Sequence, residues 1–354
     1  MIPHSRPTLG TEEKRALEEV LESGEIAQGR RVREFEKNFC ALLGRRYAVA
    51  VSSGTSALHL SLLALEIGRG DEVILPSYTC AALLHAVAAA GARPVVVDID
   101  PEDFNLSMRE TRKKIRRRTR AVIIPHAFGR AAAIEELSDA KIAVIEDGTQ
   151  ALGAKVGDCR VGSFGRASVF SFYATKMITT GEGGMVLTNS RRVAQRLQDL
   201  RDYDKREKYD FRTNSKMTDL EAAMGIVQLG KLPAFIQRRR EIASRYTAAL
   251  QGSGVLAPAA DSRRDPVYYR YVVRVTKKPK DWLRQVRNCG IDAKEPVFKP
   301  LHRYLNLPDS QFPETTRAMK ESCSLPIYPT LSEEACREVL AAISGRGSPR
   351  YAEV

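Results

Sequence analysis

The segment Tyr47–Ser77, YAVAVSSGTSALHLSLLALEIGRGDEVILPS, contains one complete strand–helix–strand unit. Its apolar run Ala48–Val51 predicts a buried strand, Thr55–Glu66 predicts a helix, and Val73–Leu75 predicts a second strand. A helix between two short buried strands is typical of the crossover that joins neighbouring strands of a parallel sheet. This unit therefore predicts an α/β fold.

The same alternation continues to about Asn189, with helical segments such as Cys80–Ala90 between the strands. Five further runs predict strands: Val95–Ile99, Ala121–Pro125, Ile142–Ile145, Ser168–Phe172 and Met185–Leu187. Together with the first two, they predict a three-layer domain built on a largely parallel sheet of seven strands.

A long helical zone, Thr218–Leu250, follows the strands, and the polar segment Gly252–Asp265, which contains proline, predicts a linker after it. Beyond the linker, one strand and two helices predict a smaller unit, over Tyr268–Val275, Asp281–Asn288 and Glu333–Ile343. We predict a large domain over residues 1–245 and a small α+β domain over residues 246–354. The N-terminal segment could pack with the small domain.

Composition excludes several classes of protein. The chain has 354 residues, 43% of them hydrophobic and 28% charged, which is enough to build a sizeable core. It contains no apolar run long enough to span a bilayer, and its first residues lack the apolar core of a signal peptide. We expect a soluble, cytoplasmic protein without membrane insertion. Its six cysteines and five histidines are scattered without ligand spacing, so no metal site is predicted.

The net charge of +13 includes a dense cationic run, with seven Lys and Arg residues between Arg112 and Arg120. Such a run can mark a nucleic-acid surface. Here it lies between two predicted strands, without interleaved aromatic residues, and a solvated crossover helix explains it better. A nucleic-acid partner is therefore not expected, and the positive field favours a phosphorylated substrate.

Two loops at strand ends carry candidate binding residues. Ser52–Leu58 follows a strand and opens a helix, where small residues let backbone N–H groups approach an anion. An ordinary capped helix start is the alternative. Asp147 ends the run Val144–Asp147, and a carboxylate leaving a buried strand is costly unless a positive group meets it. Asp147 could also be an N-cap or a Mg²⁺ ligand.

A lysine occupies the third such loop. Phe170–Lys176 places Ser171 and then Lys176 at the end of an apolar strand, and the Gly-rich turn Gly181–Gly184 follows. A free lysine has a pKa near ~10.4 and is a poor base at neutral pH, but as an imine it can carry a carbonyl cofactor. A surface lysine is the commoner outcome. The three loops occur together and in this order, which favours a lysine that carries a cofactor over a surface lysine.

These motifs together resemble the DegT/DnrJ/EryC1/StrS sugar aminotransferases, within the fold-type-I pyridoxal-phosphate enzymes. The resemblance runs almost end to end, through Pro7–Gly10, Ser53–Thr55, Gly70–Ile74, Glu146–Asp147, Gly162–Gly165, Phe170–Phe172, Lys176, Gly181–Gly184, Met217–Thr218 and Leu325–Pro326. It implies the fold-type-I transferase fold, pyridoxal phosphate as cofactor, and pyridoxamine phosphate during turnover.

The resemblance also implies roles for single residues. Lys176 matches the Schiff-base lysine and Asp147 the partner of the pyridine nitrogen, and these two are the predicted catalytic residues. Gln150 matches the residue near the ring hydroxyl. The residues that match the phosphate site are Gly54, Thr55, Ser171 and Asn214, the last reaching in from a neighbouring subunit. A homodimer with shared active sites is therefore implied.

The chain departs from the family pattern at several positions near the expected substrate. Cys80 stands where an aromatic residue usually stacks on the cofactor; either the thiol packs there, or Tyr78 or another ring takes that place. The candidate substrate residues are Glu25, Arg130, Lys216 and His302, of which the first three replace the usual Trp, Gln and Arg. A structural hydrogen bond is the alternative role for His302.

The family resemblance implies transfer of an amino group, with glutamate as donor, to a keto sugar carried on a nucleotide. A deoxygenating branch of the family, which performs dehydration, carries His in place of Lys176, so the lysine favours amino transfer. A non-catalytic regulator or nucleic-acid binder is the alternative from another class.

Overall fold

The predicted seven-stranded sheet is present in the computed structural model, which describes residues 1–259, 261 and 263–344. Its spatial order is β1-β9-β8-β5-β4-β2-β3. In that order the strands span Tyr47–Val51, Gly184–Thr188, Ala167–Ser171, Ala143–Asp147, Thr119–Pro125, Glu72–Pro76 and Arg93–Val97. Only β9 runs antiparallel to its neighbours, so the prediction of a largely parallel sheet is confirmed.

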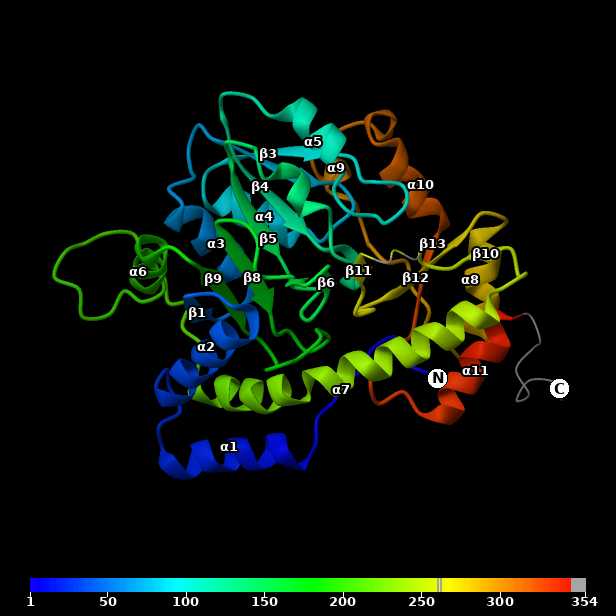
Figure 1. Cartoon of the computed structure of the whole chain (residues 1–354), viewed down its shortest axis with the longest axis horizontal. Coiled ribbons are helices and arrows are strands. Elements are labelled where there is room, and N and C mark those ends of the chain that lie inside the picture. The colour runs from blue at the N-terminus through cyan, green and yellow to red at the C-terminus, as the bar shows by residue number, and fades with distance from the viewer. Residues whose placement is uncertain (260, 262, 345–354) are drawn as a thin grey trace.

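Helices cover both faces of this sheet and form the predicted three layers (Figure 1). One face packs against α3 (Gly54–Ala64), α4 (Ala82–Ala89) and α6 (Arg191–Leu200). The other face packs against α2 (Arg30–Leu43), α5 (Met108–Lys114) and α7 (Asp219–Ala249). Because successive side chains of a strand point to opposite faces, a strand buried on both sides is apolar throughout. This explains why the strands were recognisable as continuous apolar runs.

The long helix α7 joins the two halves of the molecule (Figure 1). It begins at the N-cap Thr218, whose hydroxyl accepts from the backbone N–H of Glu221 while the Glu221 carboxylate accepts from Thr218 N–H, a capping box. The predicted helical zone Thr218–Leu250 is thereby confirmed. Helix α1 (Thr11–Ser23), which the sequence reasoning did not predict, packs along α7.

The C-terminal part forms a second core. Its sheet has the order β10-β12-β13, with strands Val255–Leu256, Tyr271–Val275 and Ser322–Leu325. The helices of this part are α8 (Pro279–Asn288), α9 (Leu301–Tyr304), α10 (Pro313–Glu321) and α11 (Glu333–Ile343). A separate short sheet combines β11 (Arg264–Asp265), β6 (Lys155–Val156) and β7 (Cys159–Arg160). The predicted strand and helices beyond residue 265 are confirmed.

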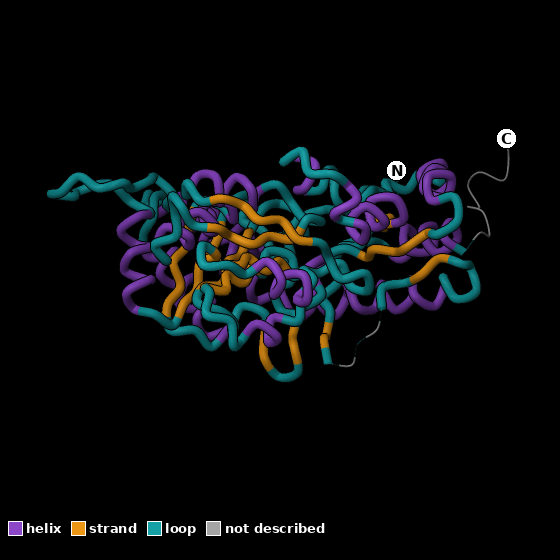
Figure 2. Tube along the Cα trace, turned by 90° about the horizontal axis from the view of Figure 1, so that it is seen from above, coloured by secondary structure: helices purple, strands orange, loops and turns teal. Residues whose placement is uncertain are grey.

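The N-terminus packs against this second core, as Figure 2 shows from above. Ile2 forms a bridge with Ile291, and the His4 ring lies 2.8 Å from Ser324 Oγ through Nε2. The predicted domain boundary at residue 245 falls inside α7 and stays a prediction, and the last ten residues of the predicted small domain lie outside the described part.

The cationic run is only partly a crossover helix. Helix α5 includes Arg112, Lys113 and Lys114 and then ends, because β4 already begins at Thr119. The remaining cations occupy an exposed turn and the first residues of β4. Among the residues that the structure describes, no helix is long and apolar enough to cross a membrane.

Candidate active site

A cavity of about 390 Å³ opens at the carboxyl ends of β2, β4, β5 and β8. Parallel sheets place ligands at this edge. The loops after these strands line the cavity together with residues from the C-terminal part; the lining includes Tyr78, Cys80, Gln150, Lys176, Tyr269 and Arg270. A larger hollow of about 1360 Å³ follows the outer strand β3, but none of the predicted site residues lines it. The smaller cavity is therefore the candidate active site.

Lys176 lies in the loop between β8 and β9. This loop is closed at its base, where Phe172 N–H donates to Gly183 O and Thr180 N–H donates to Phe172 O, both at 2.9 Å. The loop places Lys176 Nζ over the ring of Tyr269, 5.2 Å from the ring centroid. The predicted lysine therefore points into the cavity and is held against a residue from the other half of the chain.

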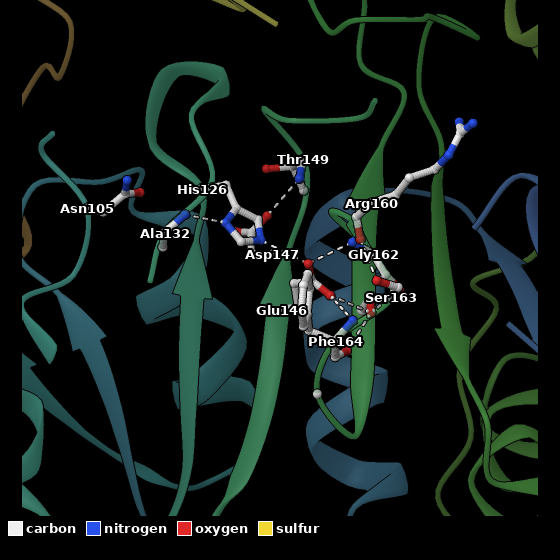
Figure 3. Close-up of polar contacts among 12 residues, drawn as sticks. Asn105, His126, Ala132, Glu146, Asp147, Thr149, Arg160, Gly162, Ser163 and Phe164 are labelled. Atoms are coloured by element: carbon white, nitrogen blue, oxygen red, sulfur yellow. Dashed lines mark hydrogen bonds and ion pairs between the residues drawn. The ribbon is translucent and has the colours of Figure 1, made fainter. Parts of the chain in front are cut away.

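Asp147 is the last residue of β5, and its side chain is 3% exposed. The backbone N–H of Thr149 donates to Asp147 Oδ1 at 3.0 Å (Figure 3). Burial raises the pKa of this carboxyl group, and the hydrogen bond from Thr149 and the charge of Lys176 offset the effect only in part. Asp147 is thus a buried acid within the electrostatic influence of Lys176, although it does not itself line the cavity.

The adjacent Glu146 points to a different environment, a closed polar network (Figure 3). Its Oε1 accepts from Gly162 N–H at 2.7 Å and lies 3.0 Å from His126 Nε2. Because His126 Nδ1 accepts from Ala132 N–H, the ring proton belongs on Nε2 and is donated to Glu146. Glu146 Oε2 accepts from Phe164 N–H at 2.9 Å and from a serine hydroxyl. This carboxylate is fully satisfied inside the protein.

The start of α3 forms a small polar cup beside the end of β8. A Cβ atom on Gly54 would lie 2.7 Å from the Cβ of Ser171, so only glycine permits this close approach. Ser53 caps the helix by accepting from Ser56 N–H at 3.0 Å. The N–H groups of Gly54 and the exposed Thr55 belong to the first turn, which has no acceptor within the helix. The cup can therefore receive an anion.

Gln150 and Cys80 also line the cavity. Gln150 Oε1 accepts from Phe128 N–H at 2.9 Å, which fixes the side chain and leaves the donor Nε2 for a ligand. Cys80 is exposed. Tyr78 lines the same cavity but is 3% exposed and packs against Phe104 and Phe128, with ring centroids 5.9 and 6.1 Å away. Both candidates for the stacking position are thus near the cavity.

Three predicted residues lie on exposed segments away from this cavity. Asn214 is exposed and forms a bridge with Asp202 on the loop that follows α6. Lys216 Nζ donates to Asp202 Oδ1 at 2.7 Å. Glu25 is exposed in the turn after α1. None of the three lines the cavity of its own chain.

Arg130 and His302 are committed to other contacts. The Arg130 guanidinium donates to Ala259 O at 2.5 Å and lies 3.6 Å from an Asp261 carboxylate oxygen. His302 is fully buried, with Nδ1 2.6 Å from Ser77 Oγ and Nε2 2.9 Å from Asp309 Oδ1. Neither side chain lines the cavity, so the structure does not support the predicted substrate role of Arg130 or His302.

The sequence reasoning missed Tyr269 and Arg270, which enter the cavity from the segment before β12. The Arg270 guanidinium carbon lies 5.7 Å from the ring centroid of Tyr269, and Arg270 Nη1 donates to Pro296 O at 2.8 Å. The only local signal was a Tyr-Tyr-Arg run at the start of a predicted strand. Such a run does not reveal which residues of the large domain it will meet.

The three-layer architecture with a largely parallel seven-stranded sheet is that of the fold-type-I pyridoxal-phosphate transferases. The profile of the DegT/DnrJ/EryC1/StrS aminotransferase family matches residues 7–344. The chain belongs to this family.

Two characterised relatives cover nearly the whole chain. It is 31% identical to the spore coat polysaccharide biosynthesis protein SpsC of Bacillus subtilis (strain 168), over 97% of this chain and 96% of the relative. It is 33% identical to a pleiotropic regulatory protein of Geobacillus stearothermophilus, over 93% of both chains.

Solved structures give the same result. The aminotransferase TlmJ from Streptoalloteichus hindustanus superposes with a TM-score of 0.91 at 33% identity, over 98% of both chains. Spr1654 from Streptococcus pneumoniae, solved in a PLP form and a PMP form, has a TM-score of 0.90 at 26% identity; the PLP form covers 97% of this chain and 98% of that chain.

Proposed function

We propose that the protein is a pyridoxal-phosphate-dependent aminotransferase that moves an amino group from glutamate to the keto group of a nucleotide-linked sugar. One observation carries this proposal: Lys176 and Gln150 line one cavity, and the charge of Lys176 acts on a buried acid, Asp147, at the end of β5. Membership of the aminotransferase family supports it.

Residues in and around the cavity suit the cofactor at three separate points. The start of α3, where Gly54 lies so close to Ser171 that a Cβ atom would clash, suits a phosphate group at a helix N-terminus. The buried Asp147 carboxylate suits a protonated ring nitrogen. The remaining donor of Gln150 suits a ring oxygen. When bound, pyridoxal phosphate would supply the electron sink for breaking a bond at the carbon that carries the amine.

The residues of the chain would do the rest. Lys176 would hold the cofactor through its amine and, once released by the amino donor, would move a proton between the substrate and the cofactor. Asp147 would keep the ring nitrogen protonated, since an unpaired buried carboxylate favours a proton or cation beside it. Gly54, Thr55 and Ser171 would orient the phosphate.

The charge of the cavity supports an anionic substrate. Among the described residues that line it, Lys176, Arg270 and Lys299 are cations and there is no Asp or Glu. Aromatic rings such as Tyr173 and the 93% exposed Phe298 provide apolar surface at its rim. A sugar carried on a nucleotide diphosphate combines such charge with a flat ring system, and the relative SpsC is named for polysaccharide biosynthesis.

We also propose a homodimer whose subunits share active sites. The loop after α6 extends away from the rest of the chain in both views (Figures 1 and 2). It exposes Tyr203, Tyr209 and Phe211 together with Asn214. Exposed aromatic rings on an extended loop favour a partner surface, and the loop could reach the cavity of a second copy. This would give Asn214 its predicted contact with the phosphate.

The test begins with cofactor attachment. Purified wild-type protein with pyridoxal phosphate should show the visible absorbance of an imine, and reduction with borohydride should tether the cofactor to Lys176. Lys176→Ala should lose both properties, whereas the surface variant Lys280→Ala should keep them. An imine band that survives in Lys176→Ala would contradict the proposal.

The second part of the test concerns the reaction. With glutamate and a panel of keto-sugar nucleotides, the wild type should form an amino sugar and a keto acid in equal amounts. Loss of a sugar hydroxyl without nitrogen transfer would instead identify a dehydratase. Colourless protein under cofactor excess, with retention on DNA that salt abolishes, would identify a regulatory binder.

A further inference from the structure

Tyr269 lies at the centre of a group of positive charges beside the candidate active site. It is 8% exposed and lines the cavity at the boundary between the two halves of the chain. Lys176 Nζ lies 5.2 Å from its ring centroid, and the Arg270 guanidinium carbon lies 5.7 Å from the same point. Thr175 Oγ1 lies 3.5 Å from the Tyr269 hydroxyl oxygen.

A third cation approaches from α7. Arg239 is 4% exposed, and its Nη1 donates to the carbonyl oxygens of Tyr269 at 3.4 Å and Ile327 at 2.8 Å. Burial lowers the pKa of Arg239 to about 10. Within the described part of the chain, no carboxylate pairs with Lys176, Arg239 or Arg270 at salt-bridge distance. The charges that act on Tyr269 are those of Lys176 and Arg270, and Lys176 also acts on the buried carboxyl group of Asp147.

The acidity of the tyrosine follows from this environment. Burial by itself raises the pKa of Tyr269, but the charges of Lys176 and Arg270 outweigh burial and lower the pKa to about 8. The neighbouring tyrosines lack these cations: burial raises the pKa of Tyr268, and it raises the pKa of Tyr271 to about 12. The folded protein thus favours the Tyr269 phenolate, and this stabilisation is fully present above pH ~10 and lost as the pH falls through about 8.

We propose that Tyr269 is a positioning residue that acts through Lys176, by holding the lysine side chain over its ring. This inference rests on the proposed role of Lys176. Once the lysine is released from the cofactor, the face of the Tyr269 ring would hold its amino group in the cavity.

Because the two side chains interact, the ionisation of Tyr269 changes the environment of Lys176. Above pH about 8 the phenolate attracts a charged lysine more strongly than the neutral phenol does. Tyr269 would therefore affect the reaction through the position of Lys176, without touching the substrate.

The direct test is a titration of the tyrosines in the cofactor-free full-length protein. The chain has 12 tyrosines, so the ultraviolet absorbance of phenolate is compared between the wild type and Tyr269→Phe. The difference should show one group that titrates near pH 8. Lys176→Met keeps the length of the side chain without its charge, and it should raise this pKa by at least about one unit, a tenfold change in the ionisation constant. Tyr268→Phe is the matched control and should keep the titration near pH 8.

The second test uses the enzyme loaded with pyridoxal phosphate. Tyr269→Phe keeps the ring and should still form the imine, but its rate of amino transfer should fall by about tenfold at pH ~9, where the wild-type tyrosine is ionised, with little change in KM for glutamate. The wild-type pH profile should lose its dependence on a group near pH 8 in this variant. A merely structural tyrosine would leave the pH profile unchanged.

Two results would overturn the inference: a titration near pH 8 that survives in Tyr269→Phe, or a tyrosine pKa that Lys176→Met does not move. Neither depends on the cofactor. If the wild type forms no imine, the proposed function fails, whereas the titration of the cofactor-free protein still reports on the Tyr269–Lys176 pair. The two failures are therefore distinguishable.

Discussion

Two adjacent carboxylates at the end of β5 lie in contrasting surroundings. Glu146 accepts hydrogen bonds from His126, from two backbone N–H groups and from Ser168, and all of its partners belong to the protein. Asp147 is almost as deeply buried, but Thr149 alone supplies the hydrogen bonds to its carboxylate among these contacts, and burial raises its pKa. Since buried polar groups are normally satisfied, the first arrangement stabilises a fold and the second suits a ligand.

The contrast extends to the positive charges on each side. Arg45 lies against the Glu146 network and donates to Ser168 Oγ at 3.1 Å, so its charge is compensated inside the protein. On the cavity side, Lys176 and Arg270 face an aromatic ring and open space, with no carboxylate at salt-bridge distance among the described residues. A structural site is closed, whereas a candidate active site keeps unused donors and charges.

The largest expected effect concerns Asp147, the carboxylate that suits a ligand. Asp147→Asn should reduce amino transfer by about 10³-fold, about 4 kcal/mol, because an amide would no longer hold a positive ring nitrogen. The stability of the cofactor-free protein should not fall, because the raised pKa means that the charged carboxylate is disfavoured in the fold at neutral pH. Steady-state kinetics and thermal unfolding measure the two quantities, and the surface variant Asp139→Asn serves as the control. A large loss of stability with little loss of rate would reverse the roles assigned to these two carboxylates.

Substitution of Glu146 should have a smaller effect, and it should change stability instead of the rate of amino transfer. Glu146→Gln leaves Phe164 N–H without an acceptor and removes the charge opposite Arg45, which should lower the free energy of unfolding by about 3 kcal/mol. Denaturant unfolding of the cofactor-free variant measures this loss. The imine should still form in the fraction that remains folded. A variant that is stable but unable to form the imine would show that Glu146 acts on the cofactor.

The smallest effect tests the anion cup. Gly54→Ala places a methyl group against Ser171 and should weaken cofactor binding by about 1–2 kcal/mol, roughly five- to thirtyfold in Kd. Gly230→Ala, in α7, meets no atom within 4 Å and should leave cofactor affinity unchanged while stabilising the helix by up to about 1 kcal/mol. Equilibrium titration with pyridoxal phosphate compares the two variants. Equal affinities would exclude the cup as the phosphate site.

The sequence reasoning was strongest where structure depends on neighbours in the chain. All seven strands of the large sheet and the helix α7 are present within two residues of the predicted limits at nearly every end. Their signals were local: apolar runs for the strands, a long helical zone for α7, and the Gly-rich turn that includes Gly183, whose φ is 139°. The same local signals brought Lys176, Gln150 and Cys80 to one cavity, because the loops after parallel strands meet at one edge.

The sequence alone thus determined the family membership and the order of the site motifs, because both depend only on the order of residues along the chain. Only the tertiary structure decided which distant side chains complete the cavity. It brought Tyr269 and Arg270 to Lys176 across more than ninety positions and committed Arg130 and His302 to other partners. The physical reason is that contacts between residues far apart in the chain depend on how whole elements pack, and no local periodicity encodes them.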